Sequence, residues 1–108
     1  MKQSFGEYIR HLRTKNELTL TQLGAKLDLD SANLSKIENG KRDFDEKRLT
    51  LLAQVFELNL EELKTEFFGD LFAKKLYESS SSTDALFVAE KKVKYLRQIN
   101  AKQESLKL

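Results

Sequence analysis

Two short helices, with only two residues between the end of the first and the N-cap of the second, constrain this 108-residue chain more than any other feature of its sequence. The first helix is predicted over residues 20–27. The second is predicted over residues 31–39, because Asp30 is a good N-cap and Gly40 tolerates the left-handed conformation that often follows a helix. Since residues 28–29 alone separate the first helix from the Asp30 cap of the second, the two helices must cross at a large angle.

The second of these helices has two contrasting faces. Leu34 and Ile37 recur at helical spacing, so we expect them to point into a hydrophobic core. A solvated helix face is normally rich in strong helix formers such as Glu, Lys and Gln, whereas this outward face carries mostly short residues. Its members are Ser31, Ala32, Asn33, Ser35 and Lys36. Short side chains let the backbone approach a flat partner, which favours insertion into a groove.

The segment that contains both helices ends on a distinctive run, Ile37-Glu38-Asn39-Gly40-Lys41. Its first helix opens with the capping box Thr19-x-x-Gln22 and carries a leucine, a small residue and a second leucine at Leu23, Gly24 and Leu27. With these features, Leu18 to Lys41 resembles the helix-turn-helix of the lambda-repressor/Cro-type family, often called XRE. The resemblance implies a sequence-specific DNA-binding transcriptional regulator of the repressor or controller type.

The family's DNA contacts carry over to matching positions of this chain. The resemblance implies base contacts from Ser31, Ala32, Asn33 and Lys36. Asn33 suits an adenine edge, Lys36 suits guanine O6 and N7, and Ala32 suits a thymine methyl. Phosphate contacts are expected from Thr19, Thr21, Gln22, Ser35, Asn39, Lys41 and Arg42. The alternative, an exposed helix with no partner, stays open at this point.

Two charged residues near the motif need separate interpretation. In the family, the acidic residue that matches Glu38 orients neighbouring side chains, including a basic one, and does not touch DNA. Arg10 and Arg13 lie on the preceding predicted helix, and we interpret them mainly as solvated surface charges, with flanking phosphate as the alternative.

The chain departs from the family pattern at three positions. Many relatives place a phosphate-binding Gln where this chain has Leu20, so that contact is either lost or supplied by Gln22. Asp28 stands where Gly is common, and Asp tolerates a left-handed turn less well than Gly but better than most residues. Phe44 stands where Pro is frequent.

The rest of the chain also has a helical pattern. It contains no Pro, only four Gly and no run that alternates as a strand would, so we expect an all-α fold. Further capped helices are predicted over 5–15, 46–56 and 60–77, which completes a five-helix lambda-repressor-like domain, and a last helix over 85–106. The expected organisation is a helix-turn-helix domain at 1–78, a Ser-rich turn at 79–84 and a C-terminal dimerisation helix at 85–108.

A second copy of the chain is the expected protein partner. One recognition helix touches few base pairs, so useful discrimination requires two helices about 34 Å apart, and hence a homodimer on a palindromic operator. The last helix carries a broad apolar face for such contact, formed by Leu86, Ala89, Val93, Leu96 and Ile99. The alternative is that this helix packs only on its own domain.

Composition limits the other classes. The chain has no Cys, its single histidine is His11, and no nucleophile stands beside a base, so we expect no metal, no cofactor and no enzymatic activity. No apolar run reaches membrane-spanning length and residues 1–11 lack a signal-peptide pattern, so a cytoplasmic location is expected. The net charge is only +2, so any DNA contact must depend on local placement of charge.

Two other functions remain as alternatives to a repressor or controller. An antitoxin of a toxin–antitoxin pair carries the same kind of motif, although it often adds a segment that wraps its toxin. A protein-interaction adaptor uses the helix-turn-helix only as a scaffold and binds a partner chain through the last helix. An adaptor shows no salt-dependent gain in affinity for any DNA sequence over random duplex.

Overall fold

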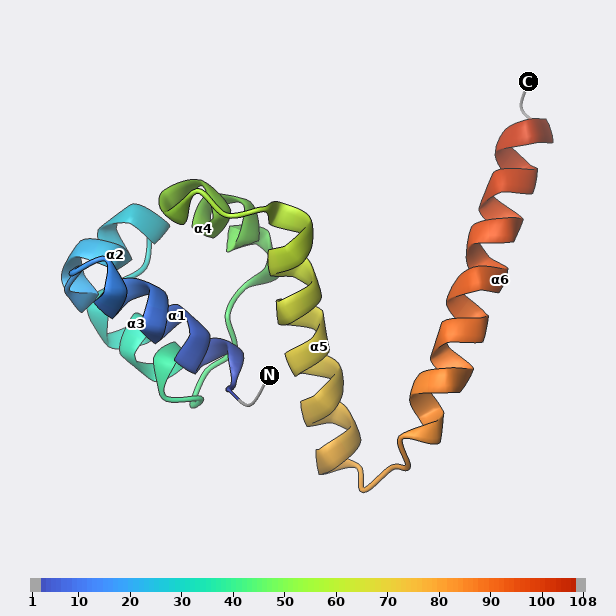
Figure 1. Ribbon diagram of the computed structural model, residues 1–108, viewed down its shortest axis with the longest axis horizontal. Helices are drawn as coiled ribbons and strands as arrows, with labels where there is room; N and C mark the ends of the chain where they lie inside the picture. The colour runs from blue at the N-terminus through green and yellow to red at the C-terminus, as the bar shows by residue number, and fades with distance from the viewer. Residues whose placement is uncertain (1–2, 107–108) are drawn as a thin grey trace. The chain divides into compact units, whose positions relative to one another are not determined.

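The structure of the protein, a computed structural model, describes residues 3–106 (Figure 1). Within these residues it contains helices and no strand, so the all-α prediction is confirmed. In chain order the elements are α1 (Phe5–Lys15), α2 (Leu20–Leu27), α3 (Ser31–Glu38), the 3₁₀ helix η1 (Glu46–Arg48), α4 (Leu49–Phe56), α5 (Leu60–Glu78) and α6 (Asp84–Leu106).

The described residues separate into two units. The first runs to Phe72 and contains α1 to α4 with most of α5, and the second begins at Ala73 and contains the end of α5 and all of α6. The helix-turn-helix segment lies entirely within the first unit.

Four helices begin at the capping residues that the sequence predicts. In each case a side-chain oxygen accepts a hydrogen bond from the backbone N–H three residues later, at 2.7 to 3.1 Å. The four pairs are Ser4 with Glu7, Thr19 with Gln22, Asp30 with Asn33, and Asn59 with Glu62. These bonds satisfy amides that the first turn of a helix leaves without intrahelical partners.

The start of the fourth predicted helix differs from the sequence prediction. An α-helix was expected from Glu46, but its first three residues form η1 and α4 begins at Leu49. Asp45 explains the tighter turn, because its carboxylate accepts from the N–H of Lys47, two residues on, and its carbonyl accepts from the N–H of Arg48 at 2.9 Å. An i to i+3 bond of this kind is the 3₁₀ pattern, which is frequent at the ends of α-helices.

One buried apolar cluster holds the first unit together. Phe5 is at its aromatic end, with ring centroids 5.6 Å from Phe44 and 5.2 Å from Phe67. Phe44, at the position where the family often has Pro, is therefore a core residue in the loop before η1. The buried members are Phe5, Ile9, Leu23, Leu27, Leu34, Ile37, Phe44, Leu49, Leu52, Ala53 and Leu63. They come from all five helices of the unit and from one loop.

Two glycines allow other backbones to approach α3 and its cap closely. A Cβ atom on Gly24 of α2 would stand 2.5 Å from the carbonyl oxygen of Leu29, just before the Asp30 cap. A Cβ atom on Gly6 of α1 would collide with the carbonyl oxygen of Ile37 near the end of α3. Such contacts leave no room for a methyl group. Both ends of α3 are thus fixed by backbone packing, which orients its outward face.

The turns on either side of α3 use left-handed backbone. Asp28, the C-cap of α2, has φ 57° and ψ 46°, so the left-handed turn expected at this position is confirmed. Gly40 follows α3 with φ 74°, where glycine meets no Cβ penalty. These two turns connect α3 to α2 and to the loop that carries Lys41 and Arg42.

Candidate nucleic-acid interface

The outward face of α3 has the composition that the sequence predicts. Leu34 and Ile37 are buried in the core, which fixes the rotation of the helix about its axis. Ser31, Ala32 and Lys36 are exposed. Asn33 and Ser35 are half-buried and lie on the same outward side. The structure therefore brings the four predicted base-contacting residues, Ser31, Ala32, Asn33 and Lys36, onto a single short helix.

Asn33 is the most constrained of these four side chains. Its backbone N–H donates to Asp30 Oδ1 at 2.7 Å, and its side-chain Nδ2 donates to Asp30 Oδ2 at 3.0 Å. On the other side, Arg42 Nη1 donates to Asn33 Oδ1 at 2.7 Å. These hydrogen bonds connect Asp30, Asn33 and Arg42, and so they link the N-cap of α3, its outward face and the loop that follows it.

The start of α2 exposes the first group of predicted phosphate contacts, Thr19, Thr21 and Gln22. Gln22 Oε1 accepts from the backbone N–H of Thr19 at 2.9 Å, which completes the capping box. Its Nε2 atom is a donor that this bond does not use. Leu20 packs against the core, so this position makes an apolar contact.

The end of α3 and the following loop carry the remaining predicted phosphate contacts. Asn39 closes α3: its backbone N–H and its side-chain Nδ2 both donate to the carbonyl oxygen of Ser35, at 3.0 and 2.9 Å. The same Nδ2 also donates to Ser35 Oγ at 3.4 Å. Lys41 and Arg42 are exposed and stand directly after the left-handed Gly40. Two cations therefore lie close to the C-terminal end of the outward face.

Arg13 differs from its predicted role as a solvated surface charge. Its Nε and Nη2 atoms donate to the two carboxylate oxygens of Glu38 at 2.7 and 3.0 Å, and Nη1 donates to the carbonyl oxygen of Leu18 at 3.0 Å. Hydrogen bonding to Glu38 raises the pKa of Arg13 above its ordinary value, although burial acts in the opposite direction. The prediction for Arg13 is therefore wrong. The partner lies 25 residues away in the sequence, so no local spacing indicates it. Arg10, by contrast, is exposed.

Glu38 is the buried partner of that pair. The expectation that Glu38 orients a basic side chain is confirmed, and that side chain is Arg13. The pair joins α1 to the last residue of α3, while the third bond of Arg13 ties both to the turn before α2. Together these contacts fix the far end of α3 against the rest of the domain.

Arg48 is a structural residue that sequence analysis did not single out. Its Nε and Nη2 atoms donate to the carbonyl oxygens of Leu27 and Asp28 at 3.0 and 3.2 Å. Its Nη1 atom lies 3.1 Å from Asp45 Oδ2. Arg48, at the end of η1, thereby fixes the turn between α2 and α3. No local pattern signals this role, because the contacts span 20 and 21 residues.

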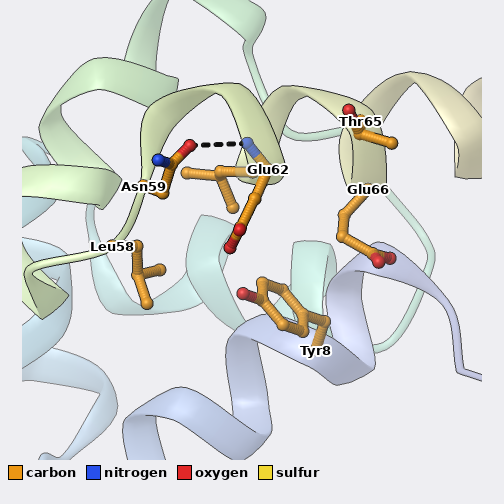
Figure 2. A pocket seen from close by; sticks show the side chains of 7 residues that line it. Tyr8, Leu58, Asn59, Glu62, Thr65 and Glu66 are labelled. Carbon is orange, nitrogen blue, oxygen red and sulfur yellow. Dashed lines mark hydrogen bonds between the residues drawn. The ribbon is translucent and has the colours of Figure 1, made fainter.

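A hollow of about 340 Å³ lies between α1 and the start of α5, away from the residues predicted to contact DNA. Figure 2 shows Tyr8 at its base, with its hydroxyl pointing toward Glu62. Burial, followed by the carboxylates of Glu66 and Glu62, raises the pKa of Tyr8 above its ordinary value. The hollow is acidic, so it does not suit phosphate.

Two other kinds of site are absent from the described part of the chain. Within residues 3–106 no three His, Cys, Asp or Glu side chains are placed to hold a metal ion together. None of the described helices combines the length and the apolar character needed to cross a membrane.

Comparison with known proteins agrees with this geometry. The family model described as helix-turn-helix matches residues 9–63, just over half of the chain. The chain belongs to this helix-turn-helix family. The matched residues include α2, α3 and the Asp30 and Gly40 positions that delimit the second helix. The predicted membership and the lambda-repressor-like fold of the first unit are thereby confirmed.

Two members of the helix-turn-helix family from Bacillus subtilis (strain 168) resemble the chain over a short segment. The HTH-type transcriptional repressor RghR is 48% identical over 40 residues, which cover 37% of this chain and 30% of RghR. The uncharacterized HTH-type transcriptional regulator RghRB is 50% identical over 38 residues, or 35% of this chain and 27% of RghRB. The chain thus aligns with less than a third of either relative. No solved structure gives a significant match.

Proposed function

We propose that this helix-turn-helix protein is a sequence-specific DNA-binding transcriptional regulator of the repressor kind that inserts α3 into the major groove. The observation that carries the proposal is the outward face of α3, which presents short side chains and Lys36. The opposite face of the same helix is fixed in the core by Leu34 and Ile37. A major groove about 12 Å wide admits one helix, and short side chains allow it to approach the base edges. The name of RghR, a transcriptional repressor, supports the same kind of activity.

Within this proposal, the DNA-contacting residues divide into two groups with different effects. Ser31, Ala32, Asn33 and Lys36 contact base edges and determine which sequence is bound. Thr19, Thr21, Gln22, Ser35, Asn39, Lys41 and Arg42 contact phosphates and determine register and overall affinity. Apart from Ser35, which lies within α3 between Asn33 and Lys36, the second group lies at the start of α2 and at the end of α3 with its following loop, so it flanks the first group along the chain.

Selection of bound sequences from a random duplex pool tests the proposal. The full chain is expected to enrich one motif repeated with two-fold symmetry, because two recognition helices on successive turns of the duplex contact equivalent half-sites. An asymmetric or single half-site motif would reject the palindromic operator while keeping DNA binding. A pool that shows no enrichment would favour an adaptor or a toxin-binding protein over a regulator.

We also propose that α6 holds two copies of the chain together. Leu86, Val93 and Leu96 are exposed on one side of this helix, and Leu96 has 59% of its surface exposed. The ion pair between Glu90 and Lys94, 3.7 Å apart, borders this side of the helix. Contiguous exposed apolar surface of this kind is typical of protein interfaces. The proposed interface residues are Leu86, Ala89, Val93, Leu96 and Ile99.

A matched pair of substitutions on α6 tests the dimer. Leu96→Glu places a charge in the proposed interface, whereas Gln98→Glu adds the same charge about 200° around the helix. Sedimentation at micromolar concentration is expected to show a monomer for Leu96→Glu and a dimer for Gln98→Glu. The Leu96 variant is also expected to lose most affinity for a full palindrome and keep weak half-site binding. A Leu96→Glu variant that remains dimeric would place the interface elsewhere.

A further inference from the structure

Arg42 contacts Asn33, a proposed base-contacting residue whose side-chain oxygen and nitrogen both make hydrogen bonds within the protein. Arg42 Nη1 lies 2.7 Å from Asn33 Oδ1, while Asn33 Nδ2 lies 3.0 Å from Asp30 Oδ2. We infer that Arg42 sets the orientation in which Asn33 meets a base, and so determines sequence specificity as well as contacting phosphate. This inference rests on the proposed function, in which α3 enters the major groove.

The chemistry of the two partners leaves only one orientation for the Asn33 amide. The guanidinium of Arg42 has donors and no acceptor, so it can bond only to the amide oxygen. The Asp30 carboxylate has acceptors and no donor, so it can bond only to the amide nitrogen. If the amide were flipped, its NH₂ group would face the donors of Arg42 and its oxygen would face the acceptors of Asp30. The orientation of Asn33 is therefore fixed before any DNA is bound.

The same bonds leave Asn33 able to contact a base. Its Oδ1 atom has two lone pairs and its Nδ2 atom has two hydrogens, and the internal bonds use one of each. One acceptor and one donor of the fixed amide remain unused by these two bonds. Adenine presents the complementary pair in the major groove, an N6 donor beside the N7 acceptor. A pre-oriented Asn33 therefore favours adenine in a single alignment.

Arg42 retains capacity for phosphate while it orients Asn33. A guanidinium carries five N–H groups, and the bond to Asn33 uses one. Arg42 is exposed on the loop after Gly40, where its other donors are open to the backbone of a duplex. One side chain thereby connects a phosphate contact to a base contact. Without Arg42, Asn33 keeps only the Asp30 bonds, and its amide loses half of the restraint on its orientation.

A double-mutant cycle on the full chain tests this role. The probes are four synthetic duplexes that carry each base pair in turn at the position where Asn33→Ala alters the selected sequence. Arg42→Ala is expected to lower the affinity for all four and to reduce the preference for the favoured pair at least about threefold. In the Asn33→Ala background, Arg42→Ala is expected to lower all four affinities by one common factor. The coupling then belongs to the Asn33–Arg42 contact.

Lys41→Ala provides the matched control, because Lys41 is the neighbouring exposed cation on the same loop. It is expected to lower the affinity for all four duplexes equally, with the base preference unchanged in both backgrounds. Thermal unfolding midpoints verify that each variant is folded.

The possible failures are distinguishable. If Asn33→Ala changes no base preference at any position, the proposed role of Asn33 is wrong and the inference fails with it. If Asn33→Ala removes a preference that Arg42→Ala leaves intact, Arg42 is a phosphate contact only and the proposed function stands. If Arg42→Ala and Lys41→Ala reduce the preference equally, the effect is general charge loss, and the inference is overturned.

Discussion

The guanidinium of Arg13 donates one hydrogen bond to each carboxylate oxygen of Glu38, with N to O distances of 2.7 and 3.0 Å. Only 13% of the Arg13 side chain and 4% of the Glu38 side chain are exposed, so both charges are largely withdrawn from water. Glu38 is the last residue of α3, and Arg13 belongs to α1. The pair therefore fixes the C-terminal end of α3 against α1.

Removing either partner should destabilise the domain strongly. Glu38→Ala or Arg13→Ala leaves one buried charge without its partner, which costs about 3 to 5 kcal/mol in the free energy of unfolding. Urea denaturation measures this loss. Arg10→Ala is the control, because Arg10 is exposed on the same helix and should change stability by less than about 0.5 kcal/mol. If Arg13→Ala lowers the free energy of unfolding no more than Arg10→Ala does, the ion pair does not fix α3 against α1.

Gly6 and Gly69 should respond oppositely to the same substitution. Gly6→Ala forces a methyl group against the Ile37 carbonyl and should destabilise the domain by about 1 to 3 kcal/mol or more. A Cβ atom on Gly69 of α5 meets nothing within 4 Å, so Gly69→Ala should stabilise the helix by about 0.5 to 1 kcal/mol. Thermal or urea unfolding of the two variants measures the difference. Equal effects would contradict the close approach of α1 to α3.

Lys36→Ala should change sequence preference. Lys36 is exposed on the outward face of α3, and its loss at a direct base contact costs about 1 to 3 kcal/mol at the cognate site. Binding-site selection with the variant should return a motif relaxed at one position in each half-site. A variant that selects the parental motif with parental affinity would show that Lys36 does not contact a base.

Lys41→Ala should have the opposite kind of effect. A phosphate contact carries no sequence information, so cognate and random duplexes should both bind more weakly by a similar factor. The slope of log affinity against log salt should also become shallower by about 1. Titration of both duplexes at several salt concentrations measures the two quantities. A loss confined to the cognate duplex would instead make Lys41 a base contact.

The features that sequence predicts well are local. Asp30, Thr19 and Asn59 act as N-caps because their partners lie three residues away, and a short pattern contains both members of each pair. The left-handed turn at Asp28 is likewise local, as is the outward face of α3, which follows from the helical spacing of Leu34 and Ile37.

The features that sequence misses depend on contacts across the fold. Arg13 looks like a surface charge until α3 brings Glu38 beside it, and Arg48 has no visible role until η1 faces the turn between α2 and α3. The bond from Arg42 to Asn33 spans nine residues and a left-handed glycine, so neither helical nor turn spacing indicates it. Long polar side chains reach partners that periodicity cannot specify.

We propose above all that α3 gives this chain sequence-specific affinity for duplex DNA. The most direct measurement compares the dissociation constants of the full chain for a selected duplex and for a scrambled duplex of equal length across a series of salt concentrations. We predict binding to the selected duplex at least about a thousandfold tighter, with log affinity falling linearly with log salt for both duplexes. Equal affinity for the two duplexes at every salt concentration would contradict the account.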